Sequence, residues 1–140
     1  MSVSADPSAS SSSLISGPVT LVVPPVAAMV RVGRLTASSV ASIADLSIDD
    51  IDDIKIAVSE MITLLIQSDN RSSITLRFEV DAQSFTVEAS TPSSALDLGR
   101  NDVALATAVL DAVSDRHEVA HVDDRILMKM VKTISPRPES

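Results

Sequence analysis

The spacing of apolar residues along this chain alternates between that of a β-strand and that of an α-helix. A short apolar run at residues 19–23 (VTLVV), closed by two prolines, predicts a strand. Residues 26–44 repeat apolar positions at intervals of three and four, which predicts an amphipathic helix with a buried stripe of Val26, Met29, Val30, Gly33, Ala37, Val40 and Ala41. Arg31 and Arg34 fall between the stripe positions, so we expect both on the exposed side.

The next pattern predicts a second helix from Ser47 to about residue 67. Ser47 precedes the apolar repeat and Asp50 follows three residues later, which is the spacing of a helix N-cap and its capping box. Carboxylates crowd the first turns, where the helix dipole favours negative charge: Asp49, Asp50, Asp52 and Asp53. We therefore interpret them as helix-start electrostatics and not as a metal site. The predicted buried stripe consists of Ile51, Ile54, Val58, Met61, Ile62 and Leu65.

Alternating apolar and polar residues mark two strands after this helix. Residues 73–80 and 84–89 predict a β-hairpin around the turn Asp81-Ala82-Gln83. A segment rich in Ser, Thr and Pro at residues 90–100 predicts a loop, and residues from about 102 to 114 predict a third helix.

The chain closes with a second predicted hairpin, formed by residues 117–121 and 126–133 around the turn Asp123-Asp124. Met128 and Met130 alternate with their neighbours on its last strand, so we expect them to pack in the core. The element order β-α-α-β-β-α-β-β predicts an α+β fold, a two-layer sandwich whose three helices cover one face of a mostly antiparallel sheet.

Length and composition indicate one domain. The chain has 140 residues and 45% hydrophobic residues, enough for a core of that size. We expect a folded domain at residues 17–134, between a disordered Ser-rich N-terminus (1–16) and a disordered tail (135–140). The N-terminus lacks a basic start and an apolar region of signal-peptide type, so we expect a cytoplasmic protein.

Charge and residue types restrict the function classes further. The formal net charge is −8 and no basic stripe is present, which argues against nucleic-acid or anionic-membrane binding and suits a basic protein partner. Cysteine is absent, which excludes disulfides and thiol chemistry. His117 and His121 could pair on a metal, but their alternating context places them on one face of a strand, where we expect two solvated side chains; no metal site is predicted.

One segment carries a family resemblance. Residues 52–67 (DDIKIAVSEMITLLIQ) resemble the N box of the anti-sigma-factor serine kinases, which are GHKL (histidine-kinase-like) ATPases, where the pattern is roughly D-x-K-x-A-V-S-E-A-V-T-N-A-x-x-H. The matching positions are Asp52 or Asp53, Lys55, Ala57, Val58, Ser59, Glu60 and Thr63. The resemblance implies the histidine-kinase-like ATPase fold over about residues 19–132. Only this helix matches the family residue by residue.

Two positions of that helix bear on catalysis. The resemblance assigns Glu60 the role of general base in phosphoryl transfer, while the alternative is a glutamate that only serves the helix. The asparagine that would hold the magnesium of ATP is Leu64 here, and leucine offers no oxygen ligand.

The other family motifs of the nucleotide pocket are also replaced. The D-x-G-x-G motif corresponds to residues 89–93, where Ala89 stands for the adenine-binding aspartate and Thr91 and Ser93 stand for the glycines. Ala104 and Ala106 occupy the glycine positions of the phosphate-binding turn, and Gly99-Arg100 is its only remnant. Because the metal, adenine and phosphate positions are all replaced, we expect a degenerate nucleotide site and no cofactor. ATP and Mg²⁺ would be the cofactors only if the site still functions.

The resemblance also implies partners. These are a sigma factor, a STAS-domain antagonist and a second copy of the chain, paired through the sheet and first helix. Arg31 and Arg34 would lie on the partner surface, where they could bind carboxylates, although two ordinary solvated arginines are the alternative. We expect an anti-sigma regulatory factor that has lost kinase activity. The alternatives are an active ATP-dependent serine/threonine kinase acting on the antagonist, which would require Mg-ATP, and a non-catalytic dimerising domain, which would bind no sigma factor.

Overall fold

The computed structural model describes residues 15–68, 71–93 and 101–134. Its elements are β1 (Val19–Val23), α1 (Met29–Ile43), α2 (Ile48–Ser68), β2 (Ile74–Val80), β3 (Ser84–Pro92), α3 (Asn101–Val113), β4 (Arg116–Val122) and β5 (Arg125–Thr133). The terminal segments expected to be disordered lie outside the described residues, apart from residues 15 and 16. Ile15 packs against the core.

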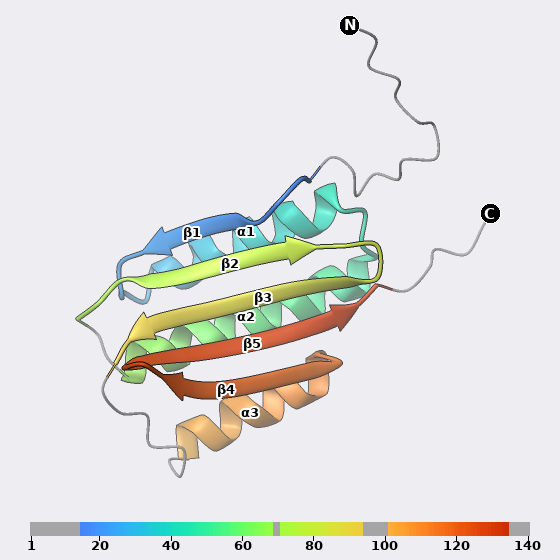
Figure 1. The fold of residues 1–140 in the computed structure, drawn as a ribbon. Coiled ribbons are helices and arrows are strands. Elements are labelled where there is room, and N and C mark those ends of the chain that lie inside the picture. Colours follow the sequence, from blue (N-terminus) through green and yellow to red (C-terminus); the bar gives the residue numbers. More distant parts are fainter. Residues whose placement is uncertain (1–14, 69–70, 94–100, 135–140) are drawn as a thin grey trace, which may run out of the picture.

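The five strands form one sheet in the order β1-β2-β3-β5-β4, and every neighbouring pair is antiparallel. All three helices lie on one face of this sheet, and its other face is open (Figure 1). The element order and the two-layer α+β architecture expected from the sequence are therefore confirmed.

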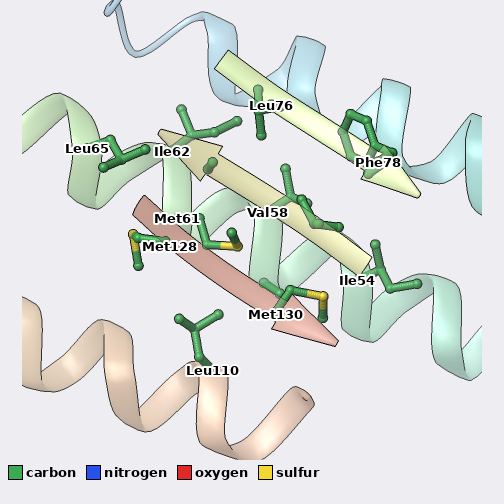
Figure 2. Close-up of a cluster of buried hydrophobic side chains, with 14 of the residues drawn as sticks. Ile54, Val58, Met61, Ile62, Leu65, Leu76, Phe78, Leu110, Met128 and Met130 are labelled. Atoms are coloured by element: carbon green, nitrogen blue, oxygen red, sulfur yellow. The ribbon is translucent and has the colours of Figure 1, made fainter. Parts of the chain in front are cut away.

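The core lies between the sheet and the helices and is almost entirely aliphatic (Figure 2). Phe78 and Phe85, the only aromatic residues of the chain, are fully buried with ring centroids 6.4 Å apart. Met128 and Met130 are also fully buried, as predicted. Because strand residues alternate between faces, every second residue of β3 and β5 points into this core.

Gly33 lets α1 lie close to α2. A Cβ at this position would come within 2.3 Å of Ile62 Cδ1 and 3.3 Å of Val58 Cγ1. Ile62 and Val58 are fully buried, so a side chain at residue 33 would require both of them to repack. The glycine in the predicted apolar stripe is therefore a contact site between the two helices.

Most element boundaries lie within one residue of the sequence prediction, and two differ by three residues. The first helix begins at Met29 and not at Val26, because the residues after the prolines form turns in which Val26 N donates to Pro24 O and Met29 N to Val26 O. Val26 is 47% exposed and does not belong to the buried stripe. The third strand does not end at Ala89. It continues through Pro92, because its pairing with β5 extends as far as Arg125.

Both predicted turns are confirmed. Asp81 Oδ1 accepts hydrogen bonds from the backbone N–H groups of Gln83 and Ser84 at 2.7 and 2.8 Å, and these bonds lower the pKa of Asp81. Asp123 and Asp124 adopt left-handed φ angles of 50° and 57°, as a tight two-residue hairpin turn requires.

Candidate functional site

The α2 helix positions the residues that resemble the N box. Its start is fixed by Ser47, whose Oγ accepts a hydrogen bond of 3.1 Å from Asp50 N, as the capping prediction required. Glu60 lies in the middle of the helix and is partly buried. Its neighbour Ser59 donates to Lys55 O at 2.9 Å, which satisfies that hydroxyl within the helix.

Leu64 lies one turn after Glu60, at the position of the family's metal ligand. It is only 2% exposed and belongs to the hydrophobic core cluster. Magnesium requires oxygen ligands and retains several waters, and an apolar side chain packed in the core provides neither. Leu64 therefore stabilises the fold at a place where the resembling family binds a metal ion.

The end of β3 carries the residues at the adenine-binding positions. Ala89 and Thr91 are fully buried and Ser93 is 7% exposed. Thr91 Oγ1 donates to Ser73 O at 3.1 Å, so its hydroxyl bonds to the chain next to β2. Glu88 points to the opposite face, where its Oε1 lies 3.9 Å from Lys129 Nζ, so it cannot replace the missing aspartate.

The backbone of Ser93 is held on both sides. Its N–H donates to Asp124 O at 2.9 Å, and its carbonyl oxygen lies 2.8 Å from His121 Nε2. In the resembling family, glycine at this position lets the backbone approach the nucleotide. Here both backbone groups bind the β4–β5 hairpin, so the N–H of Ser93 is not available to a ligand.

The α3 helix contains the last pair of candidate nucleotide positions. Ala106 is 3% exposed and packs in the core, whereas Ala104 is exposed. Asp102 lies in the first turn and its Oδ1 accepts a hydrogen bond from Val103 N at 3.0 Å. A carboxylate at this helix start opposes phosphate binding. The remnant Gly99-Arg100 lies outside the described residues.

Taken together, the described residues at the candidate site do not fit Mg-ATP. The metal-ligand and adenine positions hold buried apolar side chains, and the polar atoms beside them already have partners within the chain. Glu60 alone retains a group that could act in phosphoryl transfer.

The two histidines lie on the helix-facing side of β4, opposite the buried residues Met130 and Ile126 of β5. Each has its own partner and is not simply solvated: His117 Nε2 lies 3.5 Å from Asp111 Oδ1, and His121 Nε2 contacts Ser93 O. Within the described part of the chain, no group of three or more His, Cys, Asp or Glu side chains could hold a metal ion.

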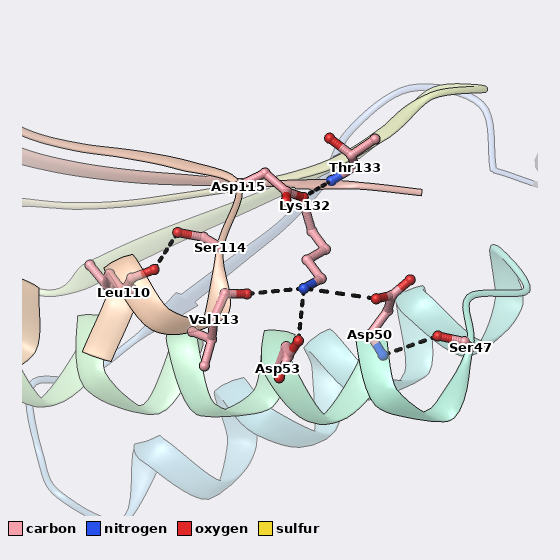
Figure 3. A network of polar contacts seen from close by, with 9 residues as sticks. All are labelled: Ser47, Asp50, Asp53, Leu110, Val113, Ser114, Asp115, Lys132 and Thr133. Atoms are coloured by element: carbon pink, nitrogen blue, oxygen red, sulfur yellow. Dashed lines mark hydrogen bonds and ion pairs between the residues drawn. The ribbon is translucent and has the colours of Figure 1, made fainter. Parts of the chain in front are cut away.

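A polar cluster that the sequence analysis did not predict joins α2, α3 and β5 (Figure 3). Lys132 Nζ donates to Asp53 Oδ2 at 2.7 Å and to Val113 O at 3.3 Å, and lies 3.8 Å from Asp50 Oδ1. Asp50 and Asp53 belong to the acidic start of α2, and Val113 is the last residue of α3. The lysine thus binds the start of one helix and the end of another.

Electrostatics keep this lysine charged. Burial lowers the pKa of Lys132, but the hydrogen bond to Asp53 and the charges of Asp53, Asp50 and Asp115 outweigh it, so the pKa is raised overall. The signal in the sequence was the place of Lys132 in an alternating strand, where it shares the inward face with Met130. An inward lysine requires a carboxylate partner, and the acidic start of α2 could have been matched to it.

Arg31 and Arg34 of α1 are both exposed to solvent, as predicted. With Leu35, Ser38 and Lys55 they line a shallow depression of about 300 Å³ between α1 and α2. Leu35 is 61% exposed there, and Val32 beside it is 36% exposed. We call these residues (Arg31, Val32, Arg34, Leu35, Ser38 and Lys55) the α1 surface. It combines three cations with exposed apolar side chains.

Comparisons with known proteins support the fold. No protein-family model matches the chain, and no curated protein matches it. Among solved structures, the chain is similar to "The crystal structure of the RsbU and RsbW domains of Rv1364c from Mycobacterium tuberculosis", with a TM-score of 0.68 and 12% sequence identity. The match covers 86% of this chain and 34% of that one, so the chain spans about a third of its length.

This likeness concerns the fold alone. It agrees with the histidine-kinase-like ATPase fold that the N-box resemblance implied, and so supports that resemblance at the level of architecture. No helix within the described residues is long and apolar enough to cross a membrane.

Proposed function

We propose that this protein is an anti-sigma regulatory factor that binds and sequesters a sigma factor, without kinase activity, under the control of a STAS-domain antagonist. The observation that carries the proposal is the contrast at α2. The metal-ligand position of α2, Leu64, is buried in the core, whereas Lys55 of the same helix lines the depression with Arg31 and Arg34 of α1.

The α1 surface has the composition of a protein-binding site. Arg31 and Arg34 can each bind a carboxylate through two parallel hydrogen bonds, and the exposed Leu35 supplies an apolar anchor in the same depression. The chain as a whole carries a net charge of −8, so three cations around one depression are a local exception. A partner with an acidic, partly apolar helix would complement this surface.

Regulation would follow from competition. A sigma factor held on the α1 surface is kept from RNA polymerase by occlusion, and an antagonist that covers the same arginines releases it. Neither step needs ATP, which agrees with the loss of the nucleotide groups. An active kinase is the less favoured alternative, because among the described candidate residues only Glu60 could act in phosphoryl transfer.

The test is binding of the purified protein to the sigma factors and STAS-domain proteins of its source organism, measured by biolayer interferometry. We expect one sigma factor to bind, and the double variant Arg31→Glu/Arg34→Glu to weaken it at least about tenfold, since close charge pairs at interfaces contribute more than 1 kcal/mol. Arg125→Glu is the matched control, because Arg125 is exposed on the opposite side of the sheet.

Two results would contradict the proposal. One is the absence of binding to any sigma factor, which would favour a non-catalytic dimerising domain. The other is transfer of phosphate from Mg-ATP to a STAS-domain protein, detected by mass spectrometry and abolished by Glu60→Ala, which would restore the kinase alternative.

A further inference from the structure

The two edges of the sheet differ in how readily they could pair with another strand. β1 forms one edge, has five residues, and is followed by Pro24 and Pro25. Short edge strands and prolines are devices that keep an edge from pairing with other chains. β4 forms the other edge with seven residues, RHEVAHV, which include neither proline nor lysine. The β4 edge is therefore the more open of the two to an added strand.

The β4–β5 hairpin turn decides which backbone groups of β4 point away from the sheet. The turn has two residues, so the pair that closes it, Val122 and Arg125, exchanges backbone hydrogen bonds. Bonded and non-bonded pairs alternate along an antiparallel ladder. The outward N–H and C=O groups therefore belong to His117, Val119 and His121.

The pairing of β5 with β3 leads to the same assignment. Ser93 N donates to Asp124 O at 2.9 Å, and Ile134 N donates to Gln83 O at 2.8 Å. With the β3–β5 register, these bonds direct the even-numbered residues of β5 toward β3 and leave its odd-numbered residues to bond β4. Those residues pair with the even-numbered residues of β4, so the odd-numbered residues of β4 point outward.

The α3 helix lies beside this edge and runs in the opposite direction to β4 (Figure 1). The contact between Asp111 and His117 shows which face of α3 is turned toward β4. Ala108 and Ala104 lie three and seven residues before Asp111, so they belong to the same face. All three are exposed, and the side chain of Asp111 is 83% exposed. Beside the edge, α3 thus presents two alanines and one carboxylate to solvent.

We propose that the outer edge of β4 binds an extended segment of a partner protein, which joins the sheet as a sixth strand. The added strand is antiparallel to β4, as are all neighbouring strands of this sheet. Its backbone bonds to the outward groups of His117, Val119 and His121. The proposal does not involve the α1 surface and is independent of the proposed function.

The side chains beside the edge define the chemistry of the segment. Residues of the added strand that lie opposite His117, Val119 and His121 point toward the helical layer, as those three do. Asp111 flanks the His117 end, and the sequence of α3 contains two carboxylates and no cation. Read from its N-terminus, the segment therefore has two apolar residues and then a lysine or arginine at alternate positions.

The test is a titration of isotope-labelled protein with the blocked peptide Thr-Val-Thr-Val-Thr-Lys-Thr, followed by NMR. We expect saturable shifts of the His117, Val119 and His121 amide signals and slower hydrogen exchange at these amides. The control peptide carries N-methyl groups on both valines, which remove two backbone donors without changing any side chain. It should bind at least about tenfold more weakly, since each lost hydrogen bond costs on the order of 1 kcal/mol.

A charge exchange tests the predicted cation. The peptide with glutamate in place of lysine should bind the wild type about threefold more weakly, as is usual for an ion pair near the surface. Asp111→Lys should reverse this preference. Asp111 is exposed, so the variant is expected to fold, and thermal unfolding checks that it does.

Four results would overturn the proposal. They are the absence of saturable binding at millimolar peptide, equal binding of the N-methylated peptide, shifts confined to another surface, and a charge preference that Asp111→Lys leaves unchanged. Protection of the three amides by raising the concentration of the protein alone would also overturn it, because a second copy would then occupy the edge. Binding to sigma factors is measured separately, so each of these results leaves the proposed function standing.

Discussion

The two ends of α2 carry opposite kinds of side chain. At its start, the carboxylates of Asp50 and Asp53 bind Lys132, and Ser47 caps the helix. Four turns later Leu64 lies in an apolar core. The polar groups of the first end bind other parts of the chain and stabilise the fold, whereas the second end offers an apolar side chain that packs in the core.

The difference shows that one helix can join distant elements through polar groups at one end and only pack at the other. Packing needs only apolar residues of suitable size at the buried positions, and Leu64 meets that need. The lysine cluster at the other end is sensitive in a different way, because removing Lys132 leaves partly buried carboxylates without their cation. The predictions below test each end in turn.

The largest effect is expected at Leu64. Leu64→Asn, which introduces the residue of the resembling family, should lower the free energy of unfolding by about 3 kcal/mol, because it removes buried apolar volume and buries an amide without partners. Urea denaturation measures this loss. Thr63→Asn is the matched control, since Thr63 is exposed on the same helix, and it should change stability by less than about 0.5 kcal/mol. A mild effect of Leu64→Asn would mean that a polar cavity exists beside α2.

The next effect concerns Lys132. Lys132→Met keeps the length of the side chain but removes the charge between Asp50 and Asp53, and should cost about 1–3 kcal/mol in denaturant unfolding. Lys129→Met on the same strand is the control, because its ion pair with Glu88 is partly exposed at 3.9 Å and should contribute less than about 1 kcal/mol. Equal losses in the two variants would show that the cluster contributes no more than a surface pair.

The same cluster predicts a dependence on alkaline pH. The folded pKa of Lys132 is raised, so its stabilising contribution is complete below the unfolded value of about 10.4 and is lost as the pH rises through the folded pKa. The stability difference between wild type and Lys132→Met should therefore be constant from neutral pH to about 10 and shrink above it. If the stability difference between the two proteins stayed constant at higher pH, the charge of Lys132 would not be the source of the stabilisation.

The smallest effect is expected at the cap. Ser47→Ala removes the hydrogen bond to Asp50 N and should cost about 1 kcal/mol in thermal or urea unfolding. Ser39→Ala provides the comparison, because Ser39 is exposed inside α1 and alanine is the better helix former there. If both substitutions raised stability, Ser47 would not act as an N-cap.

The sequence predicted the elements well because their signals are local. The capping pattern at Ser47, the two hairpin turns and the alternation that buries Met128 all depend on neighbours within a few residues. The start of α1 was misplaced because an apolar residue after two prolines can belong to a turn as easily as to a helix, and Val26 is in a turn.

Contacts between distant segments were beyond the sequence patterns. Lys132 binds Asp53, 79 residues earlier, and Ser93 is held by His121, 28 residues later. Such pairs depend on strand order, which becomes visible only in three dimensions. The candidate site could be predicted only as a set of replaced positions. The structure adds that Leu64 and Ala89, two of these positions, are buried in the core.

The most direct test of the central claim is isothermal titration calorimetry of the purified protein with Mg-ATP and Mg-ADP. The account predicts no binding at millimolar nucleotide, because the metal and adenine positions are part of the core. Saturable binding of either nucleotide that is weakened by Glu60→Ala would contradict it and make the kinase the leading function.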